Sequence, residues 1–90
     1  MGTDNPHSES PFEPKFPIDA VVDASGLRCP LPLLRAKQAI TALGSQQVLL
    51  VIATDAGADR DIPAWIKLAG HQLLLHSVDH DHREFYIQKQ

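Results

Sequence analysis

The sequence predicts an α+β fold, a two-layer sandwich in which two helices cover one face of a four-stranded mixed sheet. Three observations lead to this prediction. The 90 residues, 43% of them hydrophobic, suffice for one small domain with a modest core. Apolar patterns follow the order βαβαββ, in which the first strand–helix–strand unit joins parallel strands by a right-handed crossover. With so few elements, both helices are expected on a single face of the sheet.

The N-terminal end is expected to lie outside this domain. Residues 1–17 hold four of the seven prolines, and Phe12 and Phe16 are almost their only apolar side chains. Such a segment buries too little surface to offset the entropy lost on ordering. We therefore expect a flexible tail over 1–17 and a folded domain over 18–90, with Phe16 and Pro17 attaching the end of the tail.

The first half of the domain is expected to contain a strand and a helix. Residues 18–24 form a short strand, which the turn Ser25–Gly26 ends. The helix runs from Pro30 to about Leu43 and is stopped by Gly44. Helical spacing places one group of its apolar residues on the core side: Leu33, Ala36, Ala39, Ile40 and Leu43.

The second half is expected to supply three strands and the second helix. Residues 48–53 are apolar and largely β-branched, the pattern of a central strand covered on both faces. A polar loop follows, and Asp61 is expected to cap a helix that ends at Gly70. The last two strands cover 72–78 and 83–88, joined by a turn over 79–82. In the final strand, Phe85 and Ile87 are assigned to the covered face and Tyr86 and Gln88 to the wetter one.

The single cysteine is the most informative residue of the chain. Cys29 stands between Arg28 and Pro30, with Pro32 two residues further on. Proline is tolerated in the first turn of a helix, so Pro30 is expected as the first helical residue and Pro32 as the third. Cys29 is then the N-cap, facing the free N–H groups and the positive end of the helix dipole. Together with Arg28, this setting predicts a thiol pKa below the reference of about 8.5.

A partner-binding face is expected beside the cysteine. Leu31 and Leu34 fall outside the core side of the helix, which predicts an exposed apolar patch within one turn of Cys29. No acidic residue occurs between Ala24 and Thr54, which makes this stretch locally basic. The candidate partner-binding residues are therefore Leu31, Leu34, Arg35 and Lys37. Two alternatives remain, namely that the tail or a loop covers the leucines and that the basic residues form an ordinary solvated face.

Composition excludes several other classes of function. The formal net charge of −3 argues against a dedicated nucleic-acid binder. No apolar run is long enough to span a bilayer, no signal peptide is recognisable, and a lone cysteine forms no internal disulfide, so we expect a cytoplasmic protein. Without a second cysteine, a dithiol redox cycle within the chain is also excluded. His80 and His82 invite a metal hypothesis, but they lie in a turn where His and Asp are common, and we predict no metal site.

The segment around the cysteine also resembles a known family. The match begins with residues 23–32 and their CPxP motif, which is similar to that of the TusA/SirA-like sulfur-carrier family. It continues in order through Thr54–Asp55, 61–65, Gly70–His71 and 86–89, and covers about 18–89. The resemblance implies the same βαβαββ sandwich, which is similar to the C-terminal domain of bacterial initiation factor three. Leu31 stands where the founding branch has an acidic residue, so no pathway is selected.

The resemblance implies that Cys29 takes sulfane sulfur, carries it as a persulfide and hands it on. No organic or metal cofactor is implied, because the cargo is the covalently bound sulfur itself. The donor would be a cysteine desulfurase or a rhodanese-like protein, and the acceptor a protein in tRNA thiolation or another sulfur-relay pathway. Two alternatives remain open. One is a regulatory or adaptor module that binds protein or RNA without using Cys29, and the other is a thiol redox sensor.

Overall fold

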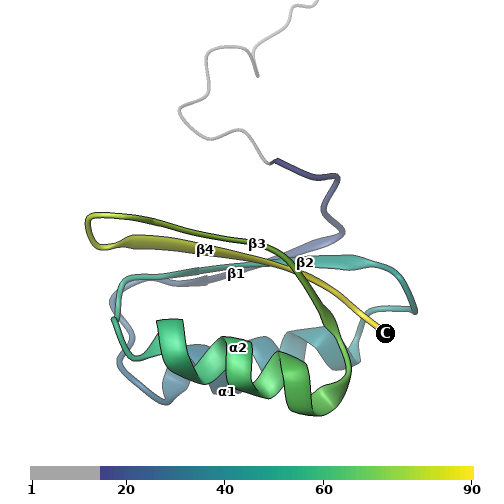
Figure 1. Ribbon diagram of the computed structural model, residues 1–90, viewed down its shortest axis with the longest axis horizontal. Helices are drawn as coiled ribbons and strands as arrows, with labels where there is room; N and C mark the ends of the chain where they lie inside the picture. The colour runs from purple at the N-terminus through teal and green to yellow at the C-terminus, as the bar shows by residue number, and fades with distance from the viewer. Residues whose placement is uncertain (1–14) are drawn as a thin grey trace, which may run out of the picture.

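The computed structural model describes residues 15–90 (Figure 1). Its elements, in chain order, are β1 (Ala20–Ala24), α1 (Leu31–Thr41), β2 (Val48–Ala53), α2 (Ala58–Ala69), β3 (Gln72–Asp79) and β4 (His82–Gln88). The four strands form one sheet in the order β1-β2-β4-β3, with β1 parallel to β2 and the other neighbours antiparallel. Both helices lie on the same side of the sheet (Figure 1). The predicted two-layer βαβαββ fold is therefore confirmed.

The core lies between the sheet and the two helices. Alternate residues of β2 and β4 point into it, since side chains of a strand alternate between the two faces. The predicted core side of α1 is also confirmed, with Ala36 and Ile40 buried and the other three positions packed against the cluster. The buried residues of this core are Ala36, Ile40, Leu49, Val51, Ala53, Ala58, Ile62, Ile66, Phe85 and Ile87.

The opposite face of the sheet is covered in part by the segment before β1. Leu50 and Tyr86 are paired across β2 and β4 on this outer face, and both are fully buried. Phe16 packs on Tyr86 with 5.4 Å between the ring centroids, and the backbone N–H of Lys15 donates a hydrogen bond of 3.1 Å to the Tyr86 hydroxyl. The assignment of Tyr86 to a wetter face was therefore wrong, because this contact comes from 71 residues away in the chain.

Lys15 and Phe16, at the end of the predicted tail, thus contact the sheet, in line with the attachment predicted for Phe16. The flexible tail predicted for the rest of the segment falls on residues 1–14, outside the described residues, and stays a prediction. Among the helices of residues 15–90, none is long and apolar enough to cross a membrane.

The first helix begins one residue later than predicted. Pro30 has φ −99° and ψ 17° and is the N-cap, so α1 starts at Leu31 and Pro32 is its second residue. The N–H of Leu31 bonds the Arg28 carbonyl at 2.8 Å in a turn that precedes the helix. Pro32 is buried and contributes packing to the first turn. The placement of Cys29 at the N-cap was therefore wrong by one position.

The second helix begins earlier than predicted. Gly57 is the N-cap and Ala58 the first helical residue, so Asp61 lies inside the first turns of α2 rather than capping it. Pro63 is also inside the helix, where its missing N–H leaves the carbonyl of Asp59 without the usual i+4 donor. Ile62 and Ile66 are buried in the core and hold this part of the helix against the sheet. The end at Gly70 is confirmed, with a left-handed φ of 84° that glycine adopts readily.

The strand ends differ from the prediction by small amounts. β1 starts at Ala20 rather than at residue 18, and the β3–β4 turn is shorter than the predicted 79–82. Only His80 and Asp81 remain between the strands, and His80 takes a positive φ of 57° to close this tight turn.

Candidate functional site

Cys29 lies in the loop between β1 and α1, and its side chain is exposed. Because β1 and β2 are parallel, the loops that follow them meet at the same edge of the sheet. The N–H of Gly26 in the first loop bonds the hydroxyl of Thr54 in the second at 2.9 Å. The cysteine is thereby placed beside the start of α2 as well as the start of α1.

Two carboxylates from this second loop and helix hold Cys29. Its Sγ donates a hydrogen bond to Oδ2 of Asp61 at 2.8 Å. Its backbone N–H donates to Oδ2 of Asp55 at 3.3 Å, and the same oxygen accepts from the N–H of Gly57 at 3.0 Å. The loop approaches so closely that a Cβ added at Gly57 would stand 3.0 Å from the Cys29 Cβ and 2.8 Å from the Asp55 carboxylate.

This setting raises the pKa of the Cys29 thiol. The main cause is the hydrogen bond to Asp61, which favours the protonated sulfur. Partial desolvation and the negative charges of Asp61 and Asp55 act in the same direction, and Arg60 alone among the described residues opposes them. The predicted lowering of this pKa was therefore wrong. Cys29 stands outside the helix cap, and the nearest charges belong to carboxylates that are distant in the sequence.

Arg28 is not among the charges that act on the Cys29 thiol in this structure. Its side chain is exposed and makes no hydrogen bond or ion pair with the residues that the structure describes. The cation of the site is Arg60, whose Nε lies 3.3 Å from Oδ1 of Asp61. The hydrogen bond from Cys29 and the contact with Arg60 lower the pKa of Asp61. The site at rest is therefore a neutral thiol beside an ionised carboxylate.

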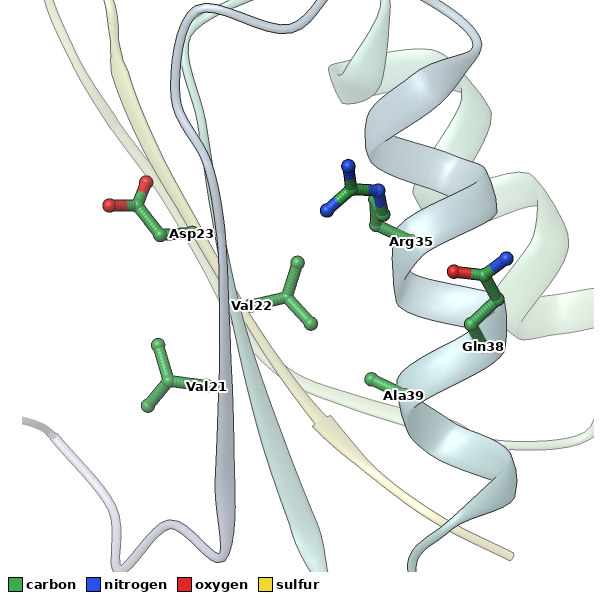
Figure 2. A pocket seen from close by; sticks show the side chains of 6 residues that line it. All are labelled: Val21, Val22, Asp23, Arg35, Gln38 and Ala39. Atoms are coloured by element: carbon green, nitrogen blue, oxygen red, sulfur yellow. The ribbon is translucent and has the colours of Figure 1, made fainter.

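The apolar part of the predicted partner-binding face is exposed, as expected. Leu31 and Leu34 are 44% and 45% exposed, so neither the described residues of the tail nor any described loop covers them. Arg35 lies on one flank of α1, where it lines a groove between this helix and β1 (Figure 2). Lys37, two positions further on, faces the opposite flank, since each residue turns the helix by about 100°. The four residues thus surround the exposed side of α1 rather than forming one cluster.

The groove beside Arg35 belongs to the edge of the sheet rather than to the thiol. Val22 points toward α1, whereas Val21 and Asp23 point to the outer side of β1 (Figure 2). Gln38 and Ala39 complete the helical wall. Cys29 is not among the lining residues, and nothing in this groove contributes to the chemistry of the sulfur.

A cluster of charged residues that the sequence analysis missed lies next to the site and holds its loop in place. Arg83 is buried at the start of β4, where its Nε bonds Asp59 at 2.7 Å and its Nη1 bonds the carbonyls of Thr54 and Asp81 at 3.1 and 3.0 Å. His76 bonds the other oxygen of Asp59 at 2.9 Å and stacks on Phe85. This cluster ties the loop carrying Asp55 to α2. The sequence signal that could have revealed this cluster is Arg83, a charged residue at a position of the last strand that faces the core.

The histidines of the β3–β4 turn form local pairs. His80 bonds Asp79 and His82 bonds Glu84, each at 2.8 Å. Within residues 15–90, no three His, Cys, Asp or Glu side chains gather as metal ligands would. The chemistry of the site therefore rests on the thiol and its two carboxylates.

The fold and the site define a class of protein, a small α+β sandwich that presents one exposed cysteine at the start of its first helix. Comparison with known proteins agrees. The family model described as "Sulfurtransferase TusA" matches residues 20–89, and the chain belongs to this family.

Individual relatives cover nearly the same region. The protein YrkI of Bacillus subtilis is 49% identical over 71 residues, which are 79% of this chain and 95% of YrkI. The sulfur carrier protein TusA of Allochromatium vinosum is 46% identical over 72 residues, or 80% of this chain and 95% of that protein. The crystal structure of a SirA-like protein from Desulfitobacterium hafniense superposes with a TM-score of 0.69 at 26% identity, covering 78% and 96% of the two chains. The homologues of this chain thus support a sulfur-carrier role.

Proposed function

We propose that Cys29 accepts sulfane sulfur as a persulfide and relays it to an acceptor protein. One observation carries the proposal. The only thiol of the chain is exposed just before α1, in a protein that belongs to a family of sulfur carriers. With one cysteine, the sulfur atom is received from one partner and passed to another, and no disulfide forms within the chain.

The two steps of this relay balance without an added oxidant. In loading, Sγ of Cys29 attacks the sulfane sulfur of a donor persulfide. The new S–S bond forms as the donor S–S bond breaks, the electron pair leaves with the donor thiolate, and the proton of Cys29 is released. In delivery, an acceptor nucleophile attacks the outer sulfur, and the electron pair returns to Sγ, which regains a proton.

The residues around Cys29 have supporting roles in this proposal. Pro30 caps α1 and Pro32 packs in its first turn, which fixes where the chain turns from the thiol into the helix. Leu31 and Leu34 offer an apolar surface to the donor and the acceptor, with Arg35 and Lys37 on its flanks. Arg28 adds positive charge to the same exposed end.

Membership of the family supports a proposal for the two kinds of partner. The donor is a cysteine desulfurase or a rhodanese-like protein, and the acceptor is a protein of tRNA thiolation or another sulfur-relay pathway. Direct binding to nucleic acid is not expected, given the net charge of −3. A single free thiol suits a reducing compartment, so the cytoplasm remains our prediction for the location of the relay.

Mass spectrometry tests this function directly. After incubation with a cysteine desulfurase and cysteine, the intact protein should gain the mass of one sulfur atom, and a reductant should remove it. Cys29→Ser should gain nothing, and equal labelling of this variant would contradict the proposal. If the Cys29→Ser variant bound its partners and performed its role as well as the wild type, the protein would instead be an adaptor. If Cys29 formed only a sulfenic acid or an intermolecular disulfide, the protein would be a redox sensor.

A further inference from the structure

Asp61 occupies a position from which it controls the proton of Cys29. Its Oδ2 accepts the hydrogen bond from Sγ at 2.8 Å, while its Oδ1 is held by Nε of Arg60 at 3.3 Å. An ionised carboxylate has no proton to donate, so this bond exists only while the sulfur carries its own proton. Ionisation of Cys29 therefore breaks the hydrogen bond and places two negative charges in contact.

The other charged groups at the sulfur do not compensate for this repulsion. Asp55 lies on the backbone side of Cys29 and adds a second negative charge, while Arg60 is the one cation within residues 15–90 that favours the thiolate. The Arg60 side chain is 81% exposed, so water screens its charge strongly. Gly57 lies close to the sulfur on the loop side, where an added Cβ would stand 3.4 Å from Sγ. The thiol is therefore open to solvent yet held in its less reactive form.

We propose that Asp61 is the residue that makes Cys29 react slowly with small-molecule electrophiles and, once loaded, pass its sulfur slowly to small-molecule thiols. This inference rests on the proposed sulfur-carrier function and adds a selectivity device to it. In the empty carrier, Asp61 keeps Sγ protonated, and a protonated thiol is a poor nucleophile. In the loaded carrier, attack on the outer sulfur must expel Sγ as a thiolate beside Asp61, and a thiol that resists ionisation leaves slowly.

Alkylation of Cys29 measures how strongly Asp61 restrains the empty carrier, without any transfer of sulfur. Because Cys29 is the only cysteine, the rate of carbamidomethylation by iodoacetamide reports on this thiol alone, and the pH dependence of the rate reports its thiolate fraction. Asp61→Asn keeps the size of the side chain but removes its charge. We expect this variant to react about tenfold faster at neutral pH and its pH profile to shift to lower pH.

A matched control separates this effect from a general change in charge. Asp81→Asn removes one negative charge from an exposed turn residue that is not among the charges acting on Cys29, and it should react at the wild-type rate. Arg60→Gln should shift the profile in the opposite direction, to higher pH. This second variant also keeps the inference testable if Asp61→Asn does not fold. An unchanged or slower rate in folded Asp61→Asn, or a faster one in Arg60→Gln, would overturn the inference.

Release of the bound sulfur measures how strongly Asp61 restrains the loaded carrier. Persulfide-loaded protein is mixed with glutathione, and the loss of one sulfur from the intact mass is followed in time. Asp61→Asn should lose its sulfur several-fold faster than the wild type and Asp81→Asn, because its leaving thiol ionises more easily. Equal rates of loss would contradict this part of the inference. If no variant acquires sulfur at all, the carrier function itself fails, while the alkylation rates still decide whether Asp61 restrains the thiol.

Discussion

Cys29 and the two leucines after it lie at one exposed end of the molecule, but they differ in what surrounds them. The thiol is held by Asp55 and Asp61 from a distant loop and helix. Leu31 and Leu34, by contrast, are exposed and do not belong to the core cluster. At the scale of single residues, the chemistry of the site and its apolar surface are therefore separable by mutation.

Replacing Leu34 by alanine tests the apolar surface. Since Leu34 is exposed, Leu34→Ala should change the free energy of unfolding by less than about 0.5 kcal/mol. It should nevertheless slow sulfur transfer from a protein donor severalfold, because large apolar side chains at a docking site contribute much of its binding energy. Alkylation of Cys29 by iodoacetamide should keep the wild-type rate. Denaturant unfolding and donor-dependent sulfur loading measure the two effects.

Ile40→Ala is the matched control on the buried side of the same helix. Ile40 belongs to the core cluster, so its truncation should cost about 2–5 kcal/mol. If Leu34→Ala were equally destabilising, Leu34 would be a core residue and the proposed docking surface would be lost.

At the scale of elements, the contact between α2 and β4 orders the loop that carries Asp55. Burial raises the pKa of Asp59, but the hydrogen bonds from Arg83 and His76 outweigh it and lower the pKa overall. A carboxyl with a lowered pKa in the folded state contributes stability above its unfolded pKa of about 3.9, and this contribution is lost as the pH falls through the folded value. The cluster therefore stabilises the fold at neutral pH and fails in acid.

Asp59→Asn should make this dependence visible. At pH 7 the variant should lose about 1–3 kcal/mol of unfolding free energy, because the nearly buried Arg83 is left without its carboxylate partner. The difference from the wild type should begin to shrink as the pH falls below about 4, where the carboxyl of the unfolded chain takes up its proton, and should vanish below the lowered pKa of the folded carboxyl. Urea unfolding across this pH range provides the measurement.

Asp79→Asn serves as the comparison for this cluster. Its ion pair with His80 is almost fully exposed, so its loss should leave the stability within about 0.5 kcal/mol at every pH. A pH-independent deficit in Asp59→Asn would show that lost packing, rather than the charge of the pair, explains the effect.

At the scale of the whole molecule, the sheet is covered unequally on its two faces. Two helices cover the inner face (Figure 1). On the outer face, within the described residues, the segment before β1 covers Tyr86 through Phe16. Burial is the main cause that raises the pKa of the Tyr86 hydroxyl. The N-terminal segment is therefore divided into a part that packs on the sheet and residues 1–14, for which composition alone predicts a flexible tail.

Two variants separate these parts. Deletion of residues 1–14 should leave the melting temperature and the yield of persulfide nearly unchanged, as expected for a segment too polar to bury surface. Phe16→Ala in the full chain should cost about 1–2 kcal/mol, because it removes an aromatic contact that covers Tyr86. Differential scanning calorimetry measures the stability of both variants, and the intact mass after sulfur loading measures the yield of persulfide. A loss of several degrees on deletion would show that residues such as Phe12 pack on the domain.

Much of the fold follows from local patterns in the sequence. The apolar run of β2 and the helical spacing in α1 predict the element order, the parallel pair and the exposure of Leu31 and Leu34, because periodicity records which side of an element is buried. Turn residues predict the ends near Gly70 and the β3–β4 turn. The lone cysteine before two prolines is equally local, and its resemblance to a sulfur-carrier motif needs no coordinates.

The tertiary structure alone decided what contacts each of these features. The proton acceptor of Cys29 is Asp61, which lies 32 residues away and reaches the thiol because parallel strands bring their following loops to one edge. The cover of Tyr86 comes from the opposite end of the chain. Local sequence thus determined where a reactive thiol is presented. The direction in which its pKa moves depends on charges that only folding brings within a few ångströms of the sulfur.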